Sequence, residues 1–253
     1  MITLGQPFRF VYLYSAFNQK MKGKIFMVPV TIGNSNHMMT IPPVTREITA
    51  SLRIFAVEDV RSARRYLRSI DREFPVDDTL FIPIGKHSEP AALSELFSRV
   101  SEGMDAGVMS EAGMPGLADP GNMVVEEAHR RSITVVPLTG PSSIMLALVA
   151  SGMNGQSFSF NGYLPVDPQA RRKAIADLEK RSATGQTQIF METPFRNARM
   201  LDDILKVCNP STRLCIAADI TMSTESIITR SVEGWLRERP DIDKRHVVFL
   251  LLA

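Results

Sequence analysis

The residues best suited to chemistry in this chain lie in one loop, residues 110–121, which reads Ser-Glu-Ala-Gly-Met-Pro-Gly-Leu-Ala-Asp-Pro-Gly. Its glycines would let a ligand approach the backbone closely, and Glu111 places a carboxylate beside them. The loop matches neither GxGxxG nor GxxxxGK(S/T), and it has no lysine to meet a phosphate. Such a loop suits a ligand that carries hydroxyls, an amine or a positive centre. The alternative is an ordinary turn with a solvated glutamate.

A second loop of the same kind, residues 139–143, reads Thr-Gly-Pro-Ser-Ser. Ser142 and Ser143 would lie at the N-terminus of a helix predicted over residues 144–150. Backbone N–H groups at that position have no partner within the helix and can bind a carboxylate. The alternative is that the two serines only cap the helix.

Two groups of basic residues could contact phosphates. In a predicted helix, Arg61, Arg64, Arg65 and Arg68 follow the spacing i, i+3, i+4, i+7, which places four cations on one face. Residues 171–173, Arg-Arg-Lys, form the second group. Binding to phosphates is one interpretation. A solvated helix face is the other, and we favour it for the first group because charge runs usually serve solvation.

The elements that would position the first loop alternate between strand and helix. The apolar runs 24–30, 54–57, 79–84, 106–109 and 134–138 predict buried parallel strands, and helical patterns follow them. The first half is therefore expected to be a doubly wound parallel sheet, in which ligands bind where strands end. For the helix after the first loop we expect Asp119 as the N-cap and Pro120 as the first residue. Ser88 is expected to cap an earlier helix.

After Gly152 the pattern changes to a mixed sheet with helices. Residues 214–218 and 226–230 are expected to be antiparallel neighbours, and Trp235 is expected in a short helix with a core role. We place the domain boundary near Gly140. The prediction is an α/β protein of two domains: residues 24–139 with a doubly wound, mainly parallel sheet, and residues 140–253 with a mixed sheet. The active-site cleft is expected between them, because ligands favour domain interfaces.

The composition excludes several classes of protein. The chain has 253 residues, 44% of them hydrophobic and 22% charged, as in ordinary globular proteins. A net charge of +2 neither demands nor excludes nucleic acid. Cys208 and Cys215 form no CxxC motif, so a reducing cytoplasm is expected. The four histidines form no metal-binding pattern, and no apolar run has the length of a transmembrane helix, so neither a metal nor a membrane is expected.

Residues 1–23 are expected to be an extension before the first strong strand signal. Their apolar residues follow no basic n-region and precede no small-residue cleavage site, which argues against a signal peptide. Met21 stands just before the strand signal. We therefore hold as a hypothesis that residues 1–20 are not part of the native chain.

Several motifs occur in a fixed order around the two loops. They are Ile-Gly-Asn (32–34), Val-Glu-Asp-Val-Arg (57–61), the loop 110–121, Gly-Pro-Ser-Ser (140–143), Ser-Phe-Asn-Gly-Tyr-Leu-Pro (159–165) and Glu-Thr-Pro-Phe-Arg (192–196). This set resembles the tetrapyrrole methylase superfamily over about residues 24–253. It is most similar to the branch that methylates a ribose hydroxyl of small-subunit ribosomal RNA.

The resemblance implies a homodimeric methyltransferase that binds S-adenosyl-L-methionine between two α/β domains. The cofactor carries a sulfonium, an amine, a carboxylate and hydroxyls but no phosphate, which agrees with a lysine-free glycine loop. The cofactor-binding residues implied by the resemblance are Ser110, Glu111, Ala112, Gly113, Met114, Ser142, Ser143, Met191 and Ala218.

A hydroxyl acceptor would need a base to take its proton as the methyl group is transferred. Glu58, Asp59 and Glu192 are candidates because each follows a predicted strand. For each of them a structural role is the alternative.

The chain departs from the ribosomal RNA branch at several motifs. Residues 218–222, Ala-Asp-Ile-Thr-Met, replace the usual Arg-Glu-Leu-Thr-Lys and lose two cations, and Phe195 stands where that branch has His. Fewer cations weaken the case for RNA but leave the cofactor assignment unchanged. We favour a methyltransferase acting on ribosomal RNA or the small ribosomal subunit. A methyltransferase for a tetrapyrrole or other small molecule, or a non-catalytic relative that binds cofactor or RNA, remains open.

Overall fold

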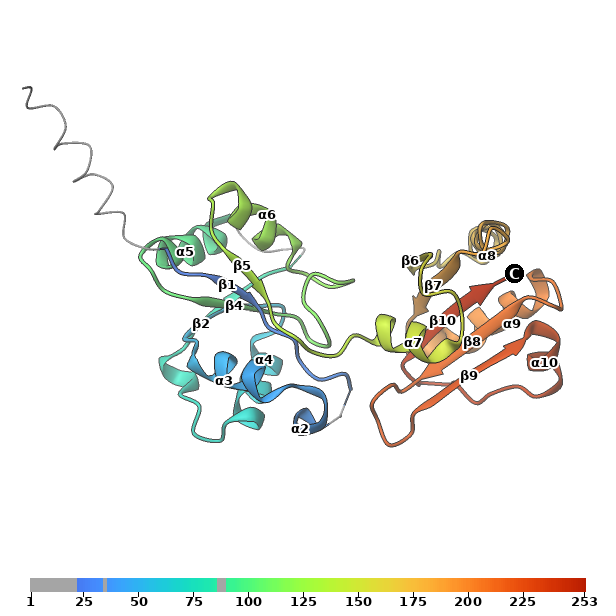
Figure 1. Cartoon of the computed structure of the whole chain (residues 1–253), viewed down its shortest axis with the longest axis horizontal. Coiled ribbons are helices and arrows are strands. Elements are labelled where there is room, and N and C mark those ends of the chain that lie inside the picture. The colour runs from blue at the N-terminus through green and yellow to red at the C-terminus, as the bar shows by residue number, and fades with distance from the viewer. Residues whose placement is uncertain (1–21, 34–35, 86–89) are drawn as a thin grey trace, which may run out of the picture. The chain divides into compact units, whose positions relative to one another are not determined.

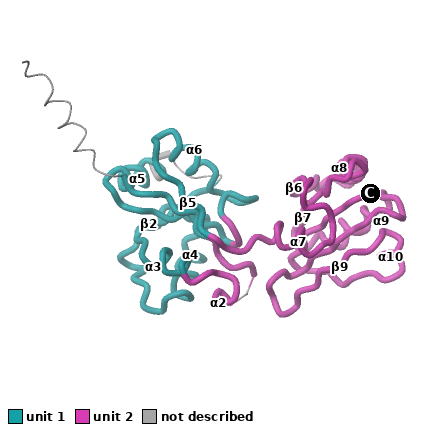
Figure 2. The backbone as a smooth tube through the Cα atoms, viewed as in Figure 1, with its two compact units in different colours: residues 1–28, 44–111, 115–138 teal, residues 29–43, 112–114, 139–253 magenta. Residues whose placement is uncertain are grey.

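The computed structural model describes residues 22–33, 36–85 and 90–253 (Figure 1). Most of the expected extension, together with Asn34 and the expected helix cap Ser88, lies outside these residues. The chain divides into two compact units, coloured separately in Figure 2. Among the described residues, unit 1 comprises residues 22–28, 44–111 and 115–138. Unit 2 comprises residues 29–43, 112–114 and 139–253.

Unit 1 contains a five-stranded sheet in which every pair of neighbours is parallel. The order is β3-β2-β4-β1-β5, so β2 and β4 are neighbours although β3 lies between them in the sequence. The strands are β1 (Ile25–Met27), β2 (Ile54–Val57), β3 (Leu80–Pro83), β4 (Ala106–Met109) and β5 (Val135–Pro137).

Helices cover both faces of this sheet (Figure 1). On one face, a core cluster joins strand residues such as Ile54 and Val108 to Phe97 and Val124 of two helices. On the other face, the Phe55 ring contacts the rings of Phe74 and Phe81 at centroid distances of 6.3 and 6.0 Å. The helices are α3 (Pro43–Ser51), α4 (Val60–Ile70), α5 (Pro90–Ser101) and α6 (Asn122–Arg130), with the short η1 (Val76–Asp78). The expected doubly wound parallel sheet is confirmed.

Unit 2 contains a mixed five-stranded sheet of order β6-β7-β10-β8-β9. β6 runs parallel to β7, and β10 runs antiparallel to both β7 and β8. β8 and β9 are antiparallel neighbours, as expected for residues 214–218 and 226–230. The strands are β6 (Phe158–Tyr163), β7 (Thr187–Glu192), β8 (Arg213–Ala218), β9 (Ser226–Ser231) and β10 (Val247–Leu252).

The helices of unit 2 cover opposite faces of this sheet. α7 (Ser143–Ser151) packs on β8, β9 and β10. A core cluster on the other face joins Phe190 and Phe249 to residues of α8, α9 and α10, including the buried Trp235, whose core role is confirmed. These helices are α8 (Pro168–Ser182), α9 (Asn197–Val207) and α10 (Val232–Arg237), with η2 (Pro194–Arg196) before α9. Unit 2 also contains α2 (His37–Thr40), a short helix that the sequence did not predict.

The expected start of the helix after the first loop was wrong. α6 begins at Asn122, its N-cap is Gly121 with a φ of 137°, and no side chain caps it. Pro120 is not in the helix, because its carbonyl accepts a hydrogen bond from Gly116 N at 3.1 Å and closes the loop on itself. Asp119 is therefore not a cap, and its carboxyl group is available for another role. Within the described residues, no helix is long and apolar enough to cross a bilayer.

Candidate active site

The loop between β4 and α6 is fixed by its backbone. Gly113 has a left-handed φ of +68°, and its carbonyl accepts a hydrogen bond from Val30 N at 2.9 Å. A Cβ atom at Gly113 would lie 3.5 Å from the Pro141 carbonyl oxygen, which is an ordinary contact. The conformation of the loop, rather than lack of space, therefore requires glycine here. Ser110 is buried, whereas Glu111 and Ala112 are exposed.

Three carboxylates gather at the ends of β2 and β4. Glu58 Oε2 accepts a hydrogen bond from Glu111 N at 3.2 Å, and Ser62 Oγ donates to Glu111 Oε1 at 3.4 Å. Burial and the nearby Glu58 and Glu111 raise the pKa of Asp119 to about 6, and a hydrogen bond with Ser110 opposes that shift. None of the three forms an ion pair with a lysine or arginine in the described part of the chain.

Asp119 is the member of this group that the sequence did not assign to the site. Sequence spacing suggested a helix cap, whereas the structure places its carboxyl group with Glu58 and Glu111. Only the adjacency of β2 and β4 brings these segments together. The sequence feature that could have assigned Asp119 to the site is its position in the same loop as Glu111.

Asp59 has a structural task. It is the N-cap of α4, and its carboxylate accepts a hydrogen bond from Ser62 N at 2.7 Å. Hydrogen bonds from the backbone and the side chain of Ser62 lower the pKa of Asp59. A carboxylate with a lowered pKa is a weaker proton acceptor.

Ser142 caps α7, as one of the two interpretations expected. Its Oγ accepts a hydrogen bond from Met145 N at 3.4 Å, and Ser143 is the first residue of the helix. The helix ends at Gly152, which adopts the left-handed conformation. Capping leaves the first backbone N–H groups of α7 pointing out of its N-terminus.

In unit 2, the strand register places the predicted site residues on different faces. Glu192 and Ala218 both lie opposite Val247, so their side chains share the face covered by α8, α9 and α10. Ala218 is 2% exposed within that core, so it can offer a ligand only its backbone. Met191 lies opposite Val248 and faces the side of α7, where it is partly exposed.

Glu192 is buried, and only one of its two carboxylate oxygens has hydrogen-bond partners. Its Oε1 accepts hydrogen bonds from Thr193 N at 2.6 Å and Arg196 Nε at 2.9 Å, and a second guanidinium nitrogen of Arg196 lies 2.5 Å away. Its Oε2 is buried and has no hydrogen-bond partner in the described structure.

The two basic groups lie in different surroundings. The arginines of α4 are exposed, in agreement with the favoured interpretation of a solvated helix face, and Arg64 pairs with Asp77 at 3.1 Å and lies over the Phe81 ring. Arg171 is only 5% exposed and pairs with Asp203 at 2.6 Å, so its assignment to a phosphate-contacting group was wrong. The physical reason is that Arg171 lies on the buried face of α8, where it cannot reach a phosphate. Among the described residues, no group of three or more His, Cys, Asp or Glu side chains could hold a metal ion.

A family model described as Tetrapyrrole (Corrin/Porphyrin) Methylases matches residues 41–234. The chain belongs to the tetrapyrrole methylase family. The chain is 30% identical over 230 residues to the ribosomal RNA small subunit methyltransferase I of Vibrio cholerae, a match that covers 90% of this chain and 76% of that protein. The expectation of an S-adenosylmethionine-dependent methyltransferase is thereby confirmed.

Solved structures of tetrapyrrole methylases share the fold. The methyltransferase CobJ has a TM-score of 0.59 at 16% identity, covering 91% of this chain and 94% of CobJ. A uroporphyrin-III C-methyl transferase from Thermus thermophilus, complexed with S-adenyl homocysteine, has a TM-score of 0.50 at 13% identity, covering 91% of this chain and 97% of that one. These likenesses confirm the fold class.

Proposed function

We propose that this tetrapyrrole methylase transfers the methyl group of S-adenosylmethionine to a ribose hydroxyl of small-subunit ribosomal RNA. The relative from Vibrio cholerae, whose name states an activity on small-subunit ribosomal RNA, supports this substrate. The observation that carries the cofactor site is the group of Glu58, Glu111 and Asp119 beside a left-handed glycine loop. The proposal extends to a homodimer that acts in the cytoplasm.

The residues of this loop fit the chemistry of the cofactor. Three carboxylates without a basic partner among the described residues create a negative potential, which attracts a sulfonium and an amine. A phosphate would be repelled by the same group. The N-terminus of α7 offers backbone N–H groups for the cofactor's carboxylate. The proposed cofactor-binding residues are Ser110, Glu111, Ala112, Gly113, Met114, Ser142, Ser143, Met191 and Ala218.

The bound cofactor supplies an electrophilic methyl group on a positively charged sulfur. The protein's contribution is to hold the acceptor hydroxyl in line with that methyl group, which can provide much of the rate enhancement. The loop after β4 is suited to this task because hydrogen bonds from Val30 and to Glu58 fix its backbone. A fixed loop loses little conformational entropy when it binds.

The proton of the acceptor hydroxyl needs a carboxylate to receive it. Asp59 is the weakest of the three candidates, since it caps α4 and its pKa is lowered. One carboxylate oxygen of Glu192 is already engaged by Thr193 N and the Arg196 guanidinium. We therefore propose Glu58 as the first candidate, with Glu192 as the second.

The test is a methyl-transfer assay with cofactor labelled in its methyl group. Small ribosomal subunits from cells that lack this protein serve as acceptor, and a tetrapyrrole mixture serves as the competing acceptor. Label in the RNA supports the proposal, whereas label only in the small-molecule fraction would assign the chain to tetrapyrrole chemistry. No label anywhere, with cofactor binding retained, would identify a non-catalytic relative. The matched variants are Glu111→Gln, expected to lose transfer, and the distant Glu233→Gln, expected to retain it.

A further inference from the structure

Phe195 is the most exposed of the aromatic side chains noted on unit 2. It is 77% exposed, compared with 57% for Tyr163 and 38% for Phe158. It lies on η2, directly after β7 and three residues after Glu192. Single exposed apolar side chains are common on protein surfaces, so exposure alone assigns no role.

The turn that carries Phe195, residues 193–196, is stabilised by hydrogen bonds among its own residues and Glu192. Thr193 N and the Arg196 guanidinium both donate to Glu192 Oε1, and Arg196 N donates to the Thr193 carbonyl at 2.9 Å. These bonds fix the backbone on both sides of the ring. The phenyl group is thus attached to a rigid element rather than to a loose loop.

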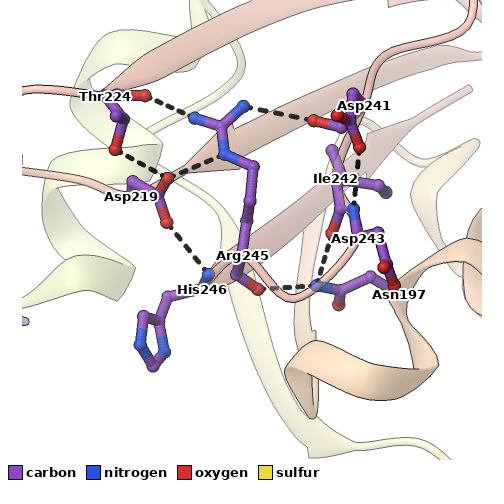
Figure 3. Close-up of polar contacts among 8 residues, drawn as sticks. All are labelled: Asn197, Asp219, Thr224, Asp241, Ile242, Asp243, Arg245 and His246. Carbon is purple, nitrogen blue, oxygen red and sulfur yellow. Dashed lines mark hydrogen bonds and ion pairs between the residues drawn. The ribbon is translucent and has the colours of Figure 1, made fainter.

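A second segment, residues 241–246, is hydrogen-bonded to Asn197, the first residue of α9, which directly follows the turn (Figure 3). Asn197 Nδ2 donates to the carbonyls of Ile242 and Arg245 at 3.2 and 2.7 Å. The Arg245 guanidinium donates to Asp219 Oδ2 at 2.7 Å, and Asp219 Oδ1 accepts from His246 N at 3.1 Å. This network anchors residues 241–246 to the C-terminal end of β8 and to the N-terminal end of α9.

The anchored segment brings a cation to the turn. Lys244 N donates to the Pro194 carbonyl at 3.2 Å, so the backbone of Lys244 lies against the residue that precedes Phe195. Lys244 is exposed and adopts a left-handed φ of 57°. Arg199, also exposed, follows Phe195 by four residues, about one helical turn. Neither has an ion-pair partner among the described residues, although Asp243 precedes Lys244 in the sequence.

We propose that Phe195 is a stacking platform for an unpaired RNA base, with Lys244 and Arg199 contacting the adjacent phosphates. Proteins bind single-stranded nucleic acid by stacking bases on exposed aromatic rings beside cations that follow the backbone. An apolar protein partner would need a broader apolar patch, whereas Thr193, Arg199 and Lys244, which are exposed and lie near Phe195 in the sequence or on the segment bonded to its turn, are polar. The inference deepens the proposed function, because it names the single-stranded form in which unit 2 receives the RNA.

The first experiment measures binding of a fluorescent, unstructured oligoribonucleotide to the full chain. Phe195→Ala should weaken binding about tenfold, whereas Phe195→Tyr keeps a ring and should bind within about twofold of the wild type. Tyr163→Ala, which removes another exposed ring from unit 2, is the matched control and should bind like the wild type. Equal affinity of Phe195→Ala and the wild type would overturn the proposal.

The second experiment examines the phosphates through the salt dependence of binding. Lys244→Ala and Arg199→Ala should each reduce the slope of log affinity against log salt concentration by about one, the change expected when one phosphate contact is lost. Lys206→Ala, at the other end of α9, is the matched control and should leave the slope unchanged. The proposal would fail if all three variants kept the slope of the wild type.

Outcomes of these experiments separate the platform from the proposed function. Methyl transfer to RNA by the wild type, with normal oligonucleotide binding by Phe195→Ala, would overturn the platform and leave the methyltransferase function intact. Loss of oligonucleotide binding in Phe195→Ala, with no methyl transfer by the wild type, would support the platform and contradict the function. An equal loss of affinity for duplex RNA would also overturn base stacking, since paired bases cannot stack on the ring.

Discussion

The carboxyl group of Asp119 lies in surroundings that oppose its ionisation. Burial, Glu58 and Glu111 raise its pKa from 3.8 to about 6. Because the folded-state pKa is raised, its contribution to stability is complete below the unfolded pKa and is lost as the pH rises through 6. Asp119→Asn should therefore be more stable than the wild type at pH 7.5, by about 1–2 kcal/mol, and should lose this advantage near pH 4.

Urea denaturation at the two pH values measures this difference in the free energy of unfolding. Asp59→Asn is the control, because the pKa of Asp59 is lowered. Its contribution is present above the unfolded pKa and lost as the pH falls, which gives the opposite dependence. A stability difference for Asp119→Asn that does not change with pH would contradict the assigned pKa.

Gly113 offers a residue-level test of the cofactor loop. Gly113→Val must place a β-branched residue at a φ of +68°, which costs about 1–2 kcal/mol of backbone strain. The expected result is a folded protein with strongly reduced affinity for S-adenosylmethionine, measured by calorimetry. Gly152→Val has nearly the same φ of 67° and open space around it, so it should lose similar stability but keep its affinity. Equal affinities in the two variants would remove the loop from the site.

At the scale of elements, the sequence predicted the buried parallel strands best. β2 and β4 have the predicted bounds because their residues are all buried and so read as continuous apolar runs. β1 is shorter than the predicted 24–30. Val28 N still donates to the carbonyl of Val108 in β4, whereas Val30 N donates to the carbonyl of Gly113, in the loop that follows β4. Local patterns cannot show that the end of the run pairs with a loop instead of a strand.

The site was predictable only where its residues are close in the sequence. The loop around Glu111 was found from its glycines, and the capping role of Ser142 from its position before an apolar helix. The grouping of Asp119 with Glu58 depends on the pairing of β2 with β4, which the order of motifs does not reveal. The burial of Arg171 likewise depends on Asp203, in another helix.

The pairing of α8 with α9 depends on that buried ion pair. Arg171→Met would leave Asp203 buried with only Arg172 at 3.4 Å, and should destabilise the fold by about 3 kcal/mol. Arg172 is exposed, so Arg172→Met should cost less than about 1 kcal/mol. Thermal and urea unfolding of both variants check this. Similar losses in the two would show that Arg171 does not carry the pairing.

At the scale of the whole molecule, the proposed homodimer needs an apolar contact surface. α7 exposes Met145, Leu146 and Val149, the last at 84%. We expect light scattering to give twice the 28.1 kDa of one chain, and Val149→Asp to shift the protein toward the monomer. Val166→Asp, at an exposed position before α8, is the control and should stay dimeric. A monomeric wild type, or a dimeric Val149→Asp, would contradict this surface.

The central claim is that the methyl group is transferred to a ribose hydroxyl of small-subunit ribosomal RNA. Alkaline hydrolysis of RNA labelled by the purified protein tests it most directly, because cleavage requires a free 2′-hydroxyl. The account predicts that the label is recovered in an alkali-resistant dinucleotide from a single position. Label released entirely as mononucleotides would place the methyl group on a base and contradict the account, as would folded, cofactor-binding protein that leaves the RNA unlabelled.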